Sequence, residues 1–163
     1  MTRIPELIVF DLDYTLWPFW VDTHVTPPFK KDPKTGNISD RHGQNIKPYP
    51  EVPKMLKHLH DNNYTLAVAS RTGEIEGANS LLQLLDWDKY FKYKEIYPGD
   101  KTRHFSRFQK DSGLPYEDML FFDDENRNIV SVSALGVTCI LVQNGMSMAE
   151  LEKGLKRFVN KHK

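Results

Sequence analysis

Acidic residues follow two short apolar runs of the chain, and they are the residues best suited to chemistry. Asp11 and Asp13 come after residues 7–10, and the pair Asp123-Asp124 comes after residues 119–122. Carboxylates crowded in a dry cleft repel one another unless a cation or a proton relieves them. Oxygen ligands with no His or Cys nearby select a hard ion, for which Mg²⁺ is the best candidate. Because magnesium with few protein ligands leaves positions open for water and a phosphate, these residues predict phosphoryl-transfer chemistry.

A hydroxyl group, a guanidinium group and an ammonium group accompany the carboxylates. Ser70 and Arg71 follow the apolar run 65–69. Ser70 by itself has little weight, because serine ends many strands and caps many helices. Arg71 could bind an anionic or hydroxyl group of a substrate, or it could form an ion pair with a nearby acid. Lys101 is favoured among the lysines because Gly99-Asp100 precedes it at a predicted helix start. Three other lysines lie close enough in the sequence to be alternatives to Lys101: Lys92, Lys94 and Lys110.

The elements that must position these residues alternate along the chain. Five apolar runs are predicted as strands: 7–10, 65–69, 93–97, 119–122 and 138–142. Most are apolar at successive positions, as is typical of strands buried on both faces of a parallel sheet.

Helical spacing of apolar residues predicts helices between successive strands and after the last one. These helices begin near Val52, Ile75 and Lys101, cover 129–135, and begin after Ser147. Ser147 and Glu150 have the spacing of a capping box. The alternation predicts an α/β fold, a three-layer sandwich with a central parallel sheet of the Rossmann-like type. Ligands of such sheets bind beyond the carboxyl ends of the strands, so the polar residues above should face one crevice.

Residues 14–50 break this alternation. They show no helical pattern and hold six of the ten prolines. Long loops inside one domain are usually functional lids or disordered, and the aromatic residues and prolines here favour an ordered flap over the crevice. Trp20 could stack on a substrate ring, whereas Trp17 and Phe19 could equally form the core of the flap.

Composition excludes several classes of protein. The 163 residues fit a single domain, 1–163, that can fold alone. Lys plus Arg and Asp plus Glu each number 22, and this zero net charge argues against a nucleic-acid partner. No apolar stretch approaches the ~20 residues of a membrane span, and no signal-peptide core is seen. A single cysteine, Cys139, excludes an intramolecular disulfide and is expected to be a buried, inert thiol. We expect a cytoplasmic protein and a monomer.

The motifs resemble those of the haloacid-dehalogenase superfamily. Residues 11–15 (DLDYT), Ser70, Lys101 and Asp123-Asp124 are similar, in order, to the four motifs of that family. Four longer stretches resemble a eukaryotic subgroup of its magnesium-dependent phosphatases: 10–20, 49–53, 69–72 and 121–128. The resemblance covers essentially the whole chain. It implies the haloacid-dehalogenase fold with a minimal, flap-type cap.

The resemblance also implies a set of roles. Asp11 would be the nucleophile that forms an aspartyl phosphate, and Asp13 would be the general acid and base. The Asp11 carboxylate, the Asp13 backbone carbonyl and the Asp123 carboxylate would hold Mg²⁺. Asp124 would either support the metal through water or cap the next helix.

Phosphate contacts complete the implied site. Lys101 would neutralise charge on the phosphoryl group, and Ser70 would bind a phosphate oxygen together with the backbone N–H groups of Leu12 and Asp13. The implied substrates are phosphotyrosine, as on a protein, and fructosamine-6-phosphates, small sugar phosphates attached to amines. Trp20 and Arg71 would suit either. The alternative is a receiver-like signalling module that is phosphorylated on aspartate without turnover.

Overall fold

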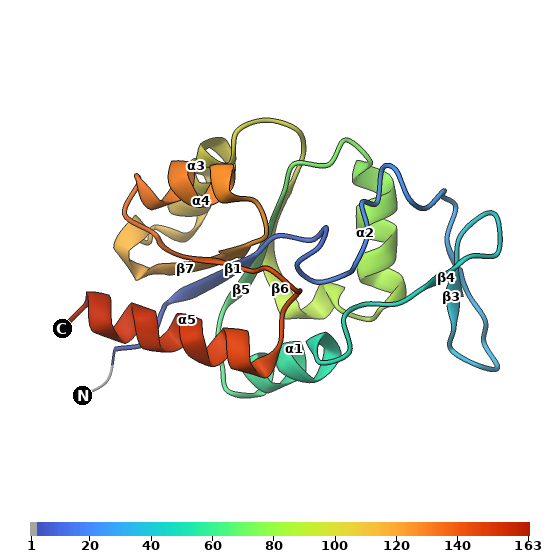
Figure 1. Cartoon of the computed structure of the whole chain (residues 1–163), viewed down its shortest axis with the longest axis horizontal. Coiled ribbons are helices and arrows are strands. Elements are labelled where there is room, and N and C mark those ends of the chain that lie inside the picture. The colour runs from blue at the N-terminus through green and yellow to red at the C-terminus, as the bar shows by residue number, and fades with distance from the viewer. Residues whose placement is uncertain (1–2) are drawn as a thin grey trace.

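Five parallel strands form the central sheet, in the order β6-β5-β1-β7-β8 (Figure 1). The computed structural model describes residues 3–163. The strands are β1 (Leu7–Phe10), β5 (Leu66–Ser70), β6 (Phe91–Ile96), β7 (Met119–Asp123) and β8 (Thr138–Leu141). The chain moves outward from β1 through β5 to β6, then crosses to β7 and β8. The strand order therefore reverses beside β1, which is where ligands bind in open sheets of this kind.

Helices cover both faces of the sheet. One face carries α1 (Val52–Asp61), α2 (Ile75–Leu84) and α5 (Met148–Lys161), and the other carries α3 (Lys101–Ser112) and α4 (Asn126–Ser133). Figure 1 shows α3 and α4 above the sheet and α1 and α5 below it. Alternate residues of β1 belong to the two cores, with Ile8 and Phe10 on one side and Leu7 and Val9 on the other. The predicted three-layer α/β sandwich is confirmed.

Several element boundaries differ from the sequence-based expectation by one to three residues. β5 extends through Ser70, and β6 starts at Phe91. α4 starts at Asn126 and ends at Ser133 rather than covering 129–135. The first turn of α4 is polar, so no hydrophobic period marks its start. After Ser133 the chain forms a turn that ends at Gly136, whose φ is 112°. Two short 3₁₀ helices complete the body: Asp88–Tyr90 and Tyr116–Asp118.

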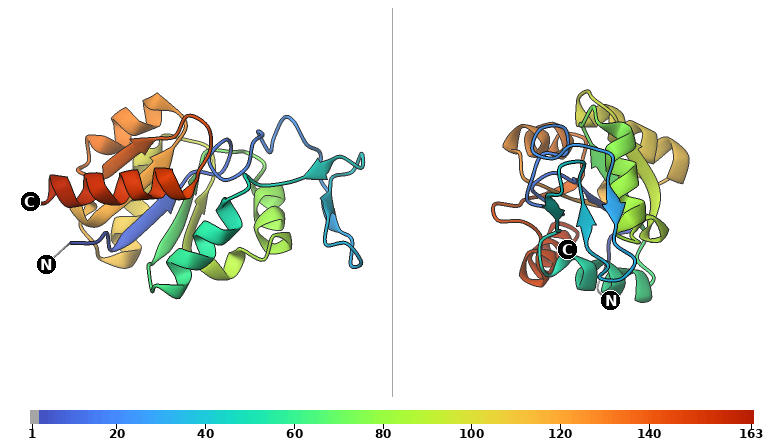
Figure 2. Two further views of the ribbon diagram at one scale, coloured as in Figure 1. Left: turned by 60° about the horizontal axis from the view of Figure 1, so that its bottom comes forward. Right: turned by 90° about the vertical axis from the view of Figure 1, so that its right-hand side faces the viewer.

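Residues 14–50 contain three short antiparallel strands and, as predicted, no helix. The strands are β2 (Lys30–Lys31), β3 (Ile38–Ser39) and β4 (Asn45–Ile46). Figure 2 shows this small sheet projecting from the body. The Asp40 carboxylate accepts hydrogen bonds from the backbone N–H groups of Thr26, His42 and Gln44, and these bonds tie the segment together.

Helix α5 approaches the sheet closely at Gly154. A Cβ at this position would overlap Cζ of Phe122 and lie 3.3 Å from Cγ1 of Ile140. We expect Gly154→Ala to destabilise the fold by about 1–2 kcal/mol, because overpacking of a core outweighs the gain in helix propensity. Denaturant unfolding measures this, with the exposed neighbour variant Lys153→Ala as the control. A Gly154→Ala protein as stable as wild type would contradict the close packing.

Two further expectations from the sequence concern Cys139 and a membrane span. Cys139 is buried, and burial raises the pKa of its thiol to about 11, which fits the predicted inert cysteine. Across residues 3–163, none of the helices is long and apolar enough to cross a membrane.

Candidate active site

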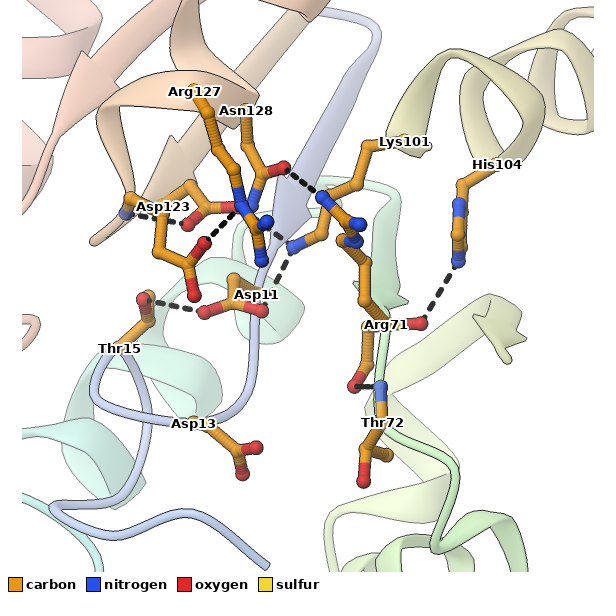
Figure 3. A network of polar contacts seen from close by, with 12 residues as sticks. Asp11, Asp13, Thr15, Arg71, Thr72, Lys101, His104, Asp123, Arg127 and Asn128 are labelled. Atoms are coloured by element: carbon orange, nitrogen blue, oxygen red, sulfur yellow. Dashed lines mark hydrogen bonds and ion pairs between the residues drawn. The ribbon is translucent and has the colours of Figure 1, made fainter. Parts of the chain in front are cut away.

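Asp11 lies directly after the central strand β1, at the carboxyl end of the sheet (Figure 3). Its Oδ1 accepts a hydrogen bond from Lys101 Nζ at 2.8 Å, and its Oδ2 accepts one from Thr15 Oγ1 at 3.1 Å. The Thr15 contact comes from a tight turn in which Thr15 N–H and Leu16 N–H donate to the Leu12 carbonyl. Burial raises the pKa of the Asp11 carboxyl well above its usual value, and the Asp123 charge raises it further against the effect of Lys101.

Lys101 is the first residue of α3 and is almost completely buried. Its Nζ lies 2.8 Å from Asp11 Oδ1 and 2.6 Å from Asp123 Oδ2. Burial lowers the pKa of Lys101, but the two carboxylates outweigh this effect and the net shift is upward. The other lysines considered lie elsewhere, since Lys94 pairs with Asp88 and both Lys92 and Lys110 are exposed.

Asp123 ends β7 and has no solvent exposure. Its Oδ2 also accepts from Asn128 Nδ2 at 3.0 Å, and its Oδ1 accepts from Glu125 N–H at 2.9 Å. Asp11, Asp123 and Asp124 each offer one carboxylate oxygen within 4.8 Å of the others. Burial is the main cause that raises the pKa of Asp124 to about 6.

This cluster fits a divalent cation. The ammonium group of Lys101 pairs with two of the three carboxylates, those of Asp11 and Asp123, and Asp124 lies beside them, so the cluster carries excess negative charge that burial makes costly. The donors are oxygens, which hard ions such as Mg²⁺ prefer. The geometry also bears on the open question about Asp124: the N-cap of α4 is Glu125, and Asp124 lies with the other carboxylates.

Asp13 is oriented apart from this cluster, as Figure 3 shows. Its Oδ1 accepts from Trp17 Nε1 at 2.8 Å and from Val21 N–H at 3.2 Å. Burial raises the pKa of Asp13, while the bonds from Trp17 and Val21 oppose the rise. The carboxyl is thus fixed in direction and retains a proton more readily than a free aspartate, as a general acid must.

Ser70 and Arg71 come from the end of β5. Ser70 Oγ accepts from Thr72 N–H at 3.2 Å, so its own hydrogen is free to be donated elsewhere. Arg71 Nη1 donates to Asn128 Oδ1 at 3.3 Å. Within residues 3–163 Arg71 forms no ion pair with an acid, so its positive charge is available to an anionic ligand.

These residues line one cavity of about 250 Å³. Its wall includes Asp11, Asp13, Ser70, Arg71, Lys101 and Asp124. Trp20 also lines the cavity and is 47% exposed, and its ring stacks on His24 with centroids 5.1 Å apart. Trp17 and Phe19 instead stack on each other and are buried, as expected if they form the core of the flap.

Thr15 and Asn128 belong to the stretches that carry the resemblance but had no assigned contact, and His104 had no role in the sequence interpretation. Thr15 stands four residues after Asp11, a spacing that a tight turn after a strand can bring together. Asn128 lies five residues after Asp123, at the start of α4. His104 carried no signal, since its partners are backbone carbonyls distant in sequence.

The chain is similar over nearly its whole length to known proteins. Residues 3–161 match the acid phosphatase family. The chain belongs to the acid phosphatase family. It is 59% identical over 158 residues to magnesium-dependent phosphatase 1 of Homo sapiens, covering 97% of this chain and 89% of that protein. This membership confirms the resemblance and the predicted class, a magnesium-dependent phosphatase of the haloacid-dehalogenase superfamily that acts on phosphorylated substrates.

Solved structures share the acid phosphatase fold at low sequence identity. CbbY from Rhodobacter sphaeroides, in complex with phosphate, has a TM-score of 0.67 at 14% identity and covers 94% of this chain and all of that one. The phosphatase domain of a Bacteroides fragilis protein, complexed with Mg, has a TM-score of 0.66 at 15% identity. That match covers 97% of this chain and 40% of the other.

Proposed function

We propose that this chain is a phosphomonoesterase that uses Mg²⁺ and forms an aspartyl phosphate on Asp11. The observation that carries the proposal is the placement of the Asp11 carboxylate. One of its oxygens is bound by Lys101 and the other by Thr15, and the residue lines the cavity beside Asp123 and Asp124. A carboxylate held in this way is prepared for attack on a phosphorus atom.

The reaction has two steps. In the first, an Asp11 oxygen attacks phosphorus, the bond to the leaving oxygen breaks, and Asp13 gives that oxygen a proton. In the second, water attacks phosphorus, Asp13 takes its proton, and the bond to Asp11 breaks to release phosphate. The hydrogen bonds that Trp17 Nε1–H and Val21 N–H donate to Asp13 Oδ1 support this role, because they leave Oδ2 free to carry the proton.

The surrounding residues hold charge and phosphate. The Asp11 carboxylate, the Asp13 backbone carbonyl and the Asp123 carboxylate would hold Mg²⁺, which when bound stabilises charge on the phosphoryl oxygens. Lys101 balances the Asp11 charge, and Ser70 donates to a phosphate oxygen, with the backbone N–H groups of Leu12 and Asp13 beside it. Arg71 takes a further anionic or hydroxyl group of the substrate.

We also propose that residues 1–163 act as a single phosphatase domain whose minimal cap is the segment 14–50. Trp20, Asp22 and Thr23 of that segment line the cavity. Such a cap leaves room for a large substrate, so phosphotyrosine on a protein and fructosamine-6-phosphates are both candidates. Trp20 offers a half-exposed ring that either could contact. The proposed setting is a monomer in the cytoplasm.

The second candidate function, a receiver-like module without turnover, has less support. Such a module needs a phosphorylated aspartate and a metal but no general acid. Here the Asp13 carboxyl is held by two donors and lines the same cavity as Asp11. This arrangement favours turnover.

One experiment tests the proposal and ranks the substrates. Hydrolysis of an aryl phosphate is measured with Mg²⁺ and with a chelator, beside phosphotyrosine and fructosamine-6-phosphate. We expect the chelator to reduce turnover by at least about 10²-fold, because the metal supplies several kcal/mol of charge stabilisation. Acid quenching during turnover should trap a phosphoenzyme that hydroxylamine cleaves. A stable adduct without turnover would favour the receiver-like function, and full activity with the chelator would contradict the proposal.

A further inference from the structure

His104 lies on α3, one turn after Lys101, and the reaction proposed above does not use it. It is completely buried. Its Nε2 lies 2.8 Å from the Ser70 carbonyl oxygen and 2.9 Å from the Tyr97 carbonyl oxygen. Both partners can only accept hydrogen bonds, so Nε2 carries the hydrogen and donates to them. Figure 3 shows the ring pointing toward the segment that carries Arg71 and Thr72.

The ring is held in place by more than these bonds. It stacks on Tyr97, with centroids 4.2 Å apart and planes 11° apart. Nδ1 carries no hydrogen in this tautomer, so its 3.3 Å approach to the Asp100 carbonyl oxygen contributes no hydrogen bond. Burial lowers the pKa of His104, which keeps the ring neutral. A neutral ring with its hydrogen on Nε2 therefore joins α3 to the residues that end β5 and follow β6.

The position of the Ser70 side chain depends on this connection. The Ser70 carbonyl accepts from His104 Nε2 and also from Tyr97 N–H, at 3.0 Å. On the same residue, Oγ accepts from Thr72 N–H and leaves its hydrogen for a ligand in the cavity. Fixing the carbonyl restrains the backbone of this residue and so the Cα–Cβ bond that carries the hydroxyl group, while the bond from Thr72 N–H restrains Oγ itself.

We propose that His104 is a positioning residue that aims the Ser70 hydroxyl at the substrate phosphate, by holding the Ser70 carbonyl against the helix that begins with Lys101. This inference rests on the proposed role of Ser70 in binding phosphate. A shift of about 1 Å in a binding group costs up to ~10²-fold in rate. The bond from His104 to the Ser70 carbonyl can therefore affect the rate even though His104 touches no ligand.

A double-mutant cycle tests the inference. His104→Phe keeps a ring that can stack on Tyr97 but removes the N–H donor. We expect it to lower kcat/KM for an aryl phosphate by about tenfold, mainly through KM, and to weaken inhibition by inorganic phosphate similarly. In a Ser70→Ala background the same change should cost less than about twofold, because no hydroxyl group remains to be aimed. His104→Gln, which retains an N–H donor, should recover part of the loss.

The controls separate this inference from the wider proposal. Thermal unfolding of each variant shows that it is folded, and His58→Phe changes an exposed histidine as a matched control. If the Phe variant does not fold, His104→Leu replaces it in the cycle.

Equal losses in both backgrounds, or no loss from His104→Phe, would overturn the inference while leaving Asp11 chemistry intact. A Ser70→Ala protein with wild-type kcat/KM would overturn it as well. Absence of phosphatase activity in wild type would instead overturn the proposed function itself.

Discussion

Replacing Asp11 by Asn is expected to abolish turnover and leave the fold intact. An amide has nearly the shape of a carboxylate, and its oxygen can still accept from Lys101 while its nitrogen faces Thr15. It is a far weaker nucleophile, and loss of a nucleophile typically costs many orders of magnitude in kcat. We therefore expect a loss of at least about 10³-fold with every substrate, measured as Mg²⁺-dependent hydrolysis.

The matched control for this variant is Asp61→Asn, which changes an exposed carboxylate on α1 that pairs with Lys57. It should retain full activity, because exposed ion pairs contribute little to stability. Acid quenching should trap phosphate on wild type and on this control, and none on Asp11→Asn. A folded Asp11→Asn protein that turns over at the wild-type rate would exclude Asp11 as the nucleophile.

Replacing Lys101 by Met is expected to cost both activity and stability. Its side chain is 1% exposed, its ammonium group lies between Asp11 Oδ1 and Asp123 Oδ2, and these carboxylates lie beside that of Asp124. Removing one partner of a buried ion pair leaves uncompensated charge and costs about 3–5 kcal/mol. For a chain of this size that corresponds to a fall in Tm of roughly 6–20 °C.

Magnesium should reverse part of that loss, which distinguishes electrostatics from packing. The three carboxylates remain in the Lys101→Met protein, and a divalent cation can neutralise them. We expect Mg²⁺ to raise Tm more in this variant than in wild type, although hydrolysis stays at least about 10²-fold reduced. Lys110→Met, an exposed position on the same helix, serves as the control. A Tm for Lys101→Met equal to wild type without Mg²⁺ would show that the buried lysine does not balance the carboxylates.

The order of the strands and helices could be predicted because the signals are local. Buried strands such as β1 and β7 are apolar at successive positions, and α1 repeats its apolar residues at helical spacing. The boundaries were less certain where the local signal is weak. The polar first turn of α4 packs through Asn128 onto Asp123, a contact that no hydrophobic period announces.

The sequence by itself determined which residues gather at the edge of the sheet. Asp11, Ser70 and Asp123 lie at the ends of strands and Lys101 begins a helix, and parallel strands present their carboxyl ends on one side. This rule is sufficient to bring Asp11, Ser70 and Asp123 together.

Only the tertiary structure decided how the side chains share the work. Trp17 is buried and Trp20 is half-exposed, although both belong to one short aromatic run. Asp124 joins the other carboxylates instead of capping α4, and Lys101 is the lysine that balances them. Spacing along the chain could not settle these outcomes, because burial and hydrogen-bond partners depend on residues distant in sequence. His104 is the clearest case. Its Nε2 bonds to two backbone carbonyls, and because every residue has a backbone carbonyl, residue types could not predict these partners.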